Sequence, residues 1–183
     1  MPTQSSSDPV ILMEKLAESV FTTVKLLRPA SPLKTIYLSA ASSLAALAEQ
    51  TAAFSDGFGL LLVMDARAFS TEVIAAAAMR LIDRGLVYLC AWGPDCQRVE
   101  DIFDEAHVEN DLEKSCPGVL MTASHHDESL TEALRFFVHS AIPDEEYAPK
   151  GCEKWIVAVI GNPEWAETVR SSIGAIASEI TAD

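Results

Sequence analysis

The sequence contains no apolar run of the roughly 18 residues that a membrane-spanning helix needs. Its longest apolar stretches, Gly59–Met64 and Trp155–Gly161, have only the length of a strand. The first residues, MPTQSSSD, lack the basic region and the small-residue cleavage site of a secretory signal. We therefore expect a cytoplasmic protein that does not bind membranes, with residues 1–8 as a disordered tail.

Cysteine is scarce and follows no recognisable pattern. The four cysteines, at positions 90, 96, 116 and 152, form no C-x-x-C pair and no zinc-ribbon spacing. Without a secretory signal they are expected to stay reduced. The sequence therefore predicts neither a disulfide framework nor a structural metal site.

The phosphate-binding motifs of nucleotide-binding proteins are also absent. No strand is followed by G-x-x-x-x-G-K-[ST] or by G-x-G-x-x-G. A phosphoacceptor receiver domain is a poor match, because Asn162 stands near the position of its expected lysine. A helix N-terminus can still bind a phosphate, and Arg67 is available as a counter-charge. We predict no cofactor.

Basic residues are few, with 13 lysines and arginines against 27 acids and a net charge of −14. Such a chain repels phosphate backbones and anionic membrane surfaces, which argues against a nucleic-acid partner. Residues 95–113 carry eight acids and one arginine. This segment is typical of a solvated helix face, and the alternative is a docking surface for a basic protein partner.

The 183 residues are 49% hydrophobic and 22% charged, which is typical of a globular protein. That length suits one domain, which we assign to residues 9–183. Asp8 and Pro9 are a good helix start, and Pro29 ends the run of helical spacing that follows. The apolar residues of this predicted N-terminal helix are Val10, Met13, Leu16, Ala17, Val20, Val24 and Leu27.

Farther along, strand patterns alternate with helix patterns. Thr35–Leu38 is a possible short strand, and the alanine-rich residues 42–54 predict a helix. The remaining strands are expected at Leu60–Met64, Leu86–Trp92, Val119–Ala123 and Trp155–Ile160, and helices from Thr71 to Gly85, Asp95 to Val108, Ser129 onward and Asn162 to about Ile180. This alternation predicts an α/β three-layer sandwich, Rossmann-like or flavodoxin-like, with a mainly parallel sheet of four to five strands. The strand order stays open.

In an open parallel sheet, ligands bind at the carboxyl ends of the strands. The loops that leave these ends contain most of the chemically versatile residues. The candidate ligand-binding residues are Asp65, Arg67, Trp92, Asp95, His125 and Asn162. Such loops also need helix caps, and Asp95 and Asn162 can serve that purpose without any further function.

The same loops offer candidates for catalysis, namely Cys96, His126 and Asp127. A helix start can lower the pKa of a cysteine thiol, and His125 or His126 could activate Cys96 while Asp127 or Glu128 orients the ring. The alternative is an inert, partly buried cysteine. Cysteine, histidine and carboxylate also suit zinc, but their spacing supports no metal site.

Two segments, L-C-A-W-G-P-D-C-Q-R-V-E-D-I-F-D-E (Leu89 to Glu105) and H-D-E-S-L-T-E-A-L (His126 to Leu134), resemble a bacterial domain family of unknown function. The similarity covers roughly residues 60–165. It implies an α/β domain and supplies no activity, cofactor or catalytic residue.

Two classes of function therefore stay open. The first is a non-catalytic module that binds a small ligand or a protein at the carboxyl edge of its sheet. The second is a thiol- or histidine-dependent hydrolase or transferase that uses Cys96 with His125 or His126. We favour the first, because a fold by itself licenses no activity. The oligomeric state is not predicted.

Overall fold

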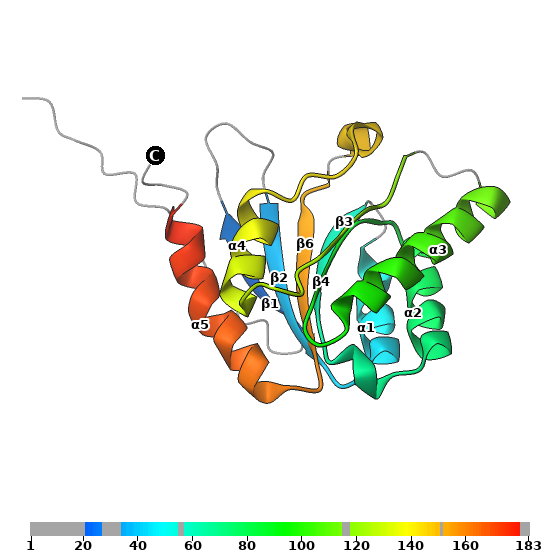
Figure 1. Cartoon of the computed structure of the whole chain (residues 1–183). Coiled ribbons are helices and arrows are strands. Elements are labelled where there is room, and N and C mark those ends of the chain that lie inside the picture. The colour runs from blue at the N-terminus through cyan, green and yellow to red at the C-terminus, as the bar shows by residue number, and fades with distance from the viewer. Residues whose placement is uncertain (1–20, 27–33, 55–56, 115–117, 151, 180–183) are drawn as a thin grey trace, which may run out of the picture.

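The computed structural model describes residues 21–26, 34–54, 57–114, 118–150 and 152–179. Strands and helices alternate along this part of the chain (Figure 1). The strands are β1 (Phe21–Leu26), β2 (Lys34–Ala41), β3 (Phe58–Val63), β4 (Leu86–Trp92), β5 (Met121–Ser124) and β6 (Lys154–Ile160). The helices are α1 (Leu44–Gln50), α2 (Thr71–Asp83), α3 (Cys96–Lys114), α4 (Leu130–His139) and α5 (Pro163–Glu179), with short 3-10 turns η1 (Thr51–Ala53), η2 (Ala66–Ala68) and η3 (Glu145–Lys150).

The strands form one sheet in the order β1-β2-β6-β3-β4-β5. Strands β2 to β6 run parallel, and β1 pairs antiparallel with β2 at one edge. Helices α1, α2 and α3 cover one face, and α4 and α5 cover the other (Figure 1). The predicted fold class, a three-layer α/β sandwich with a mainly parallel sheet, is confirmed.

The central strand β3 explains why the sheet needs both helical layers. Every residue of its sequence FGLLLV is buried. Leu60 and Leu62 face the layer of α1 to α3, whereas Leu61 and Val63 face α4 and α5. A fully buried leucine contributes roughly 1.5–3 kcal/mol, so a strand with leucines on both faces is stable only between two layers.

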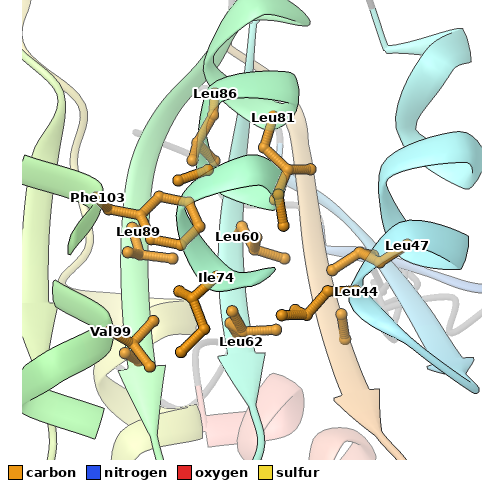
Figure 2. Close-up of a cluster of buried hydrophobic side chains, with 14 of the residues drawn as sticks. Leu44, Leu47, Leu60, Leu62, Ile74, Leu81, Leu86, Leu89, Val99 and Phe103 are labelled. Carbon is orange, nitrogen blue, oxygen red and sulfur yellow. The ribbon is translucent and has the colours of Figure 1, made fainter. Parts of the chain in front are cut away.

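Figure 2 shows how the first layer packs on the sheet. The labelled side chains are Leu44 and Leu47 of α1, Ile74 and Leu81 of α2, Val99 and Phe103 of α3, Leu60 and Leu62 of β3, and Leu86 and Leu89 of β4. All are buried. This packing fixes the position of α3, and therefore of the loop that connects β4 to it.

The acidic helix α3 has the amphipathic register that its sequence predicts. Its buried stripe consists of Val99, Ile102, Phe103 and Ala106. Asp104 and Glu105 are exposed, and Glu100 is half-buried. α3 continues to Lys114, beyond its predicted end at Val108. Neither α3 nor any other helix in the described part of the chain is long and apolar enough to cross a membrane.

Both ends of α4 are held by specific contacts. At its start, a capping box is present: Ser129 Oγ accepts a hydrogen bond from the Glu132 N–H, and the Glu132 carboxylate accepts one from the Ser129 N–H. At its end, the buried Lys34 Nζ donates to the carbonyl oxygen of Ala141 at 2.7 Å and lies 3.8 Å from the Trp155 ring centroid. These contacts hold the loop between β5 and α4 in place.

The predicted N-terminal helix is wrong where the structure describes it. Residues 21–26, the end of that helical pattern, form β1 and pair with β2 in register from Phe21 opposite Ser39 to Leu26 opposite Lys34. The sequence of β1, FTTVKL, contains three β-branched residues, which favour an extended chain next to an open sheet edge. The rest of the predicted helix, residues 10–20 and 27, lies outside the described residues.

Candidate functional site

The exit loops of three neighbouring strands are joined at the carboxyl edge of the sheet. Beyond the ends of β3 and β4, Met64 N donates to Trp92 O at 3.0 Å and Ala66 N donates to Pro94 O at 3.0 Å. On the other side of β4, His125 N donates to Ala91 O at 3.0 Å. The strand pairing therefore continues into the loops and places their side chains in a fixed relation to one another.

Strands β4 and β5 are neighbours whose following helices leave in opposite directions. α3 follows β4 onto one face of the sheet, and α4 follows β5 onto the other (Figure 1). Such a divergence opens a crevice between the carboxyl ends of two parallel strands, where α/β proteins generally bind their ligands.

A cavity of about 350 Å³ occupies this place. We call it the His125 pocket. Three segments line it: residues 92–95 after β4, the loop after β5, and the first turn of α5. The lining residues are Trp92, Gly93, Pro94, Asp95, His125, His126, Glu128 and Trp165. Four predicted site residues, Trp92, Asp95, His125 and His126, are thus brought together.

His125 is the most distinctive residue of the pocket. Its side chain is only 5% exposed, and its ring lies 4.8 Å from that of Phe136, centroid to centroid. Nδ1 is 3.0 Å from Oε2 of Glu128. Because an ionised carboxylate only accepts hydrogen bonds, Nδ1 donates to Glu128, and in the neutral tautomer that fits this bond the lone pair lies on Nε2. That buried Nε2 has no hydrogen-bonding partner among the described residues.

Two tryptophans form the apolar part of the pocket. The Trp92 and Trp165 rings are 5.3 Å apart, centroid to centroid, at 84° in an edge-to-face arrangement. Trp92 Nε1 donates to the carbonyl oxygen of Glu128 at 2.8 Å. This hydrogen bond ties the end of β4 to the loop after β5 and fixes the indole of Trp92 beside His125.

Gly93 allows the loops to approach this closely. Its φ is +118°, which side chains rarely adopt, and a Cβ at this position would lie 2.2 Å from the carbonyl oxygen of Met64. Glycine is therefore required by both the backbone conformation and the space. The next turn contains Asp95, whose φ is +64°.

Asp95 serves mainly to hold the start of α3. Its Oδ2 accepts a hydrogen bond from Arg98 Nε at 2.6 Å, and the same guanidinium donates to the carbonyl oxygens of Ala66 and Phe69. Arg98 thereby links α3 to the loop after β3. The Asp95 carboxylate lines the pocket, but its charge is paired.

Asp65, Arg67 and Asn162 do not line the His125 pocket. Asp65 and Arg67 form a doubly hydrogen-bonded ion pair on the surface, at 2.9 and 2.7 Å. The guanidinium of Arg67 lowers the pKa of the Asp65 carboxyl. Asn162 caps α5, because its Oδ1 accepts hydrogen bonds from the N–H groups of Glu164 and Trp165. The capping role proposed from the sequence therefore describes Asn162 well.

Cys96 does not line the pocket that contains the two histidines. Its side chain is 1% exposed and belongs to the core under α1 to α3 rather than to the pocket. Burial raises the pKa of the Cys96 thiol, and the backbone N–H of His125 opposes this shift only in part. The expected lowering by the helix start is therefore outweighed. His126 and Asp127 are exposed and pair with each other, Nε2 to Oδ2, at 3.0 Å.

Among the described residues, no group of three or more histidine, cysteine, aspartate or glutamate side chains is arranged to bind a metal ion. Trp165 and Arg98 are absent from the predicted site residues, and Glu128 was predicted only as a residue that could orient a histidine ring. Trp165 and Glu128 line the pocket, and Arg98 positions the loop beside it. Trp165 and Glu128 lie shortly after strands β6 and β5, so the sequence places both near the carboxyl edge of the sheet. It does not distinguish Trp165 from the helix-capping residues beside it.

The sequence was also compared with known proteins. A family model described as "Domain of unknown function (DUF7684)" matches residues 33–174. The chain belongs to this family. The resemblance of residues 89–105 and 126–134 to a domain family of unknown function is thereby confirmed, whereas its bacterial origin stays a prediction. The family match contains all five parallel strands and the whole His125 pocket. No curated protein matches the chain.

Proposed function

We propose that this domain binds a small organic molecule in the His125 pocket without transforming it. The observation that carries the proposal is the buried Nε2 of His125, which has no partner in the described part of the chain although His125 lines the cavity. A buried polar atom without a hydrogen bond costs roughly 1–3 kcal/mol. In a native structure such an atom calls for an explanation, which is a functional role or a bound water or ion.

The location and size of the pocket support the same proposal. It lies where the helices after β4 and β5 diverge, which is the usual ligand position of open α/β sheets. Its volume of about 350 Å³ is at the lower end of the range of ligand sites, roughly 300–1,000 Å³. The pocket therefore suits a small molecule better than a segment of protein.

We also propose that the protein is located in the cytosol. The free thiols of Cys90, Cys96 and Cys152 support this compartment.

The second candidate, a thiol- or histidine-dependent hydrolase or transferase, has less support. The His125–Glu128 pair has the geometry of a general base. However, the described lining residues include no serine, threonine, cysteine or lysine that this base could activate. Cys96, the proposed nucleophile, is buried in the core.

Binding can be tested with a library of small fragments that includes anions, neutral compounds and cations. The reporters are the indole N–H signals of the three tryptophans in an NMR spectrum of ¹⁵N-labelled protein. Trp92 and Trp165 line the pocket, whereas Trp155 is 1% exposed in the core and donates to Cys152 O, which makes it an internal control.

We expect some fragments to shift the signals of Trp92 and Trp165 and to leave that of Trp155 in place. Replacing His125 with phenylalanine should abolish these shifts. If no fragment at millimolar concentration moves the Trp92 and Trp165 signals selectively, the proposed function is wrong.

A further inference from the structure

The charges around the His125 pocket restrict what it can bind. Two lining residues, Asp95 and Glu128, are carboxylates, and Asp127 lies on the same loop as Glu128. The nearby guanidinium groups are already paired, Arg98 with Asp95 and Arg67 with Asp65. An anionic ligand would therefore meet the carboxylate of Glu128 without gaining an unpaired arginine.

Helix N-termini could in principle reverse this preference, because their free N–H groups attract anions. Here each of the helices α3, α4 and α5 has an acidic residue in its first turn or directly before it. The first N–H groups of α4 are capped by Ser129 and Glu132, and those of α5 by Asn162, with Glu164 in the first turn. Asp95 precedes α3 directly. The attraction of the three helix starts for an anion is therefore largely offset.

The apolar wall indicates the shape of the ligand. Trp92, Pro94 and Trp165 are three of the eight lining residues. Indole rings stack well on flat rings, and they attract cations through the negative potential of their faces. Contact with this wall therefore strengthens the binding of a planar ring that is neutral or positively charged, and it weakens the binding of a negatively charged ring.

His125 adds the requirement for a hydrogen-bond donor. Since Nδ1 donates to Glu128, Nε2 can only accept a hydrogen bond while the ring is neutral. Nε2 is buried, so binding through this atom requires a rotation of the ring or a shift of residues 126–129, which are exposed.

From these features we infer that the His125 pocket binds a planar nitrogen heterocycle that is neutral or cationic, and that it rejects the corresponding anions. This inference rests on the proposed function, because it names the class of molecule that the same pocket takes. The ring donates an N–H group to Nε2 of His125, its face packs against Trp92 and Trp165, and Glu128 provides the negative charge that a cation meets.

Three indoles that differ mainly in charge test this inference: tryptamine, a cation; 3-methylindole, which is neutral; and indole-3-acetate, an anion. Their dissociation constants are measured from the Trp92 indole signal of ¹⁵N-labelled full-length protein. We expect tryptamine to bind at least tenfold more tightly than indole-3-acetate, with 3-methylindole between them. The difference should shrink in high salt, because the charges lie at an open surface.

A pair of charge variants tests whether the pocket itself discriminates. Glu128→Gln removes one negative charge and still offers an oxygen to His125 Nδ1, so the ratio of the tryptamine and indole-3-acetate affinities should fall severalfold. Glu167→Gln removes the same charge from an exposed position on α5 that pairs with Arg170, and the ratio should not change.

The results separate the two claims. If indole-3-acetate binds as tightly as tryptamine, or if the fragments that shift Trp92 and Trp165 are anions, the inferred ligand class is wrong while the proposed binding function stands. If none of the indoles and no library fragment moves these signals, the proposed function fails, and the inference fails with it.

Discussion

His125 and Glu128 form a hydrogen-bonded pair in which Nδ1 of the ring lies 3.0 Å from Oε2 of the carboxylate. The Glu128 side chain is 46% exposed, whereas that of His125 is 5% exposed. The half-exposed carboxylate of Glu128 therefore favours the tautomer of the buried His125 ring that has its proton on Nδ1. In that tautomer Nε2 is an acceptor, and no described residue donates a hydrogen bond to it.

Replacing His125 with phenylalanine should separate its cost to stability from its value for binding. The substitution removes the unpaired Nε2 and keeps a ring beside Phe136. We expect the free energy of unfolding in urea to rise by about 1 kcal/mol, because the lost bond to Glu128 is worth less than the penalty removed. His126→Phe, at a position 58% exposed, is the control and should change stability by less than about 0.5 kcal/mol. A clear loss of stability in His125→Phe would mean that Nε2 has a partner in solution.

Gly93 should be the least replaceable glycine among the described residues of the site. Gly93→Ala combines a φ of +118° with a Cβ 2.2 Å from Met64 O, so the loops after β3 and β4 must separate. Gly161→Ala is the matched control: its φ is +69°, but nothing lies within 4 Å of the added Cβ. We expect Gly161→Ala to cost about 1–2 kcal/mol from backbone strain alone and Gly93→Ala roughly 2 kcal/mol more. Equal losses in denaturant unfolding would contradict the close approach of the two loops.

The thiol of Cys96 should be unreactive in the folded protein. Burial covers the sulfur and raises the pKa of the thiol, so the reactive thiolate is a smaller fraction at pH 7–8 than for an ordinary cysteine. We expect iodoacetamide at pH 7.5 to label Cys96 far more slowly in the native protein than in urea, as quantified for its own peptide by mass spectrometry. Rapid labelling of the native protein would restore the thiol-dependent enzyme as the better hypothesis.

The register of α3 is tested by one substitution in its buried stripe. Phe103 is fully buried against the sheet (Figure 2), so Phe103→Ala should lower the free energy of unfolding by roughly 3–5 kcal/mol. Leu112→Ala, on the same helix but at a position 85% exposed, should change it by less than about 0.5 kcal/mol. A loss below 1 kcal/mol for Phe103→Ala would show that the register is wrong.

Much of the fold follows directly from the sequence. The predicted strand Leu86–Trp92 agrees with β4 at both ends, and β3 and β6 agree to within two residues. These strands are buried on both faces and therefore appear as unbroken apolar runs. The apolar spacing of FTTVKL continues a helical pattern and therefore predicts a helix. Its β-branched residues and its pairing with the open edge of β2 make it a strand instead.

The site was predicted less completely, because strand order is a property of the whole sheet. β6 is the last of the described strands in the sequence but lies between β2 and β3 in the sheet, and no local sequence pattern predicts this position. The strand order brings Trp92, Asp95, His125 and His126 together. Trp165 joins them from α5, the helix that follows β6, and β6 lies on the far side of β3 from β4. The position of Cys96 at a helix start suggested reactivity, but its side chain turns into the core, where desolvation outweighs the helix dipole.

The most direct test of the proposed binding function is a crystallographic fragment screen on the full chain, with the charge-matched indoles included. We predict electron density for a planar ring that packs against Trp92 and Trp165, with a ring N–H within hydrogen-bonding distance of His125 Nε2. The same crystals of His125→Phe should show no such density. If the fragments bind elsewhere and the His125 pocket contains only water in both proteins, the pocket is not a ligand site and the proposed function is wrong.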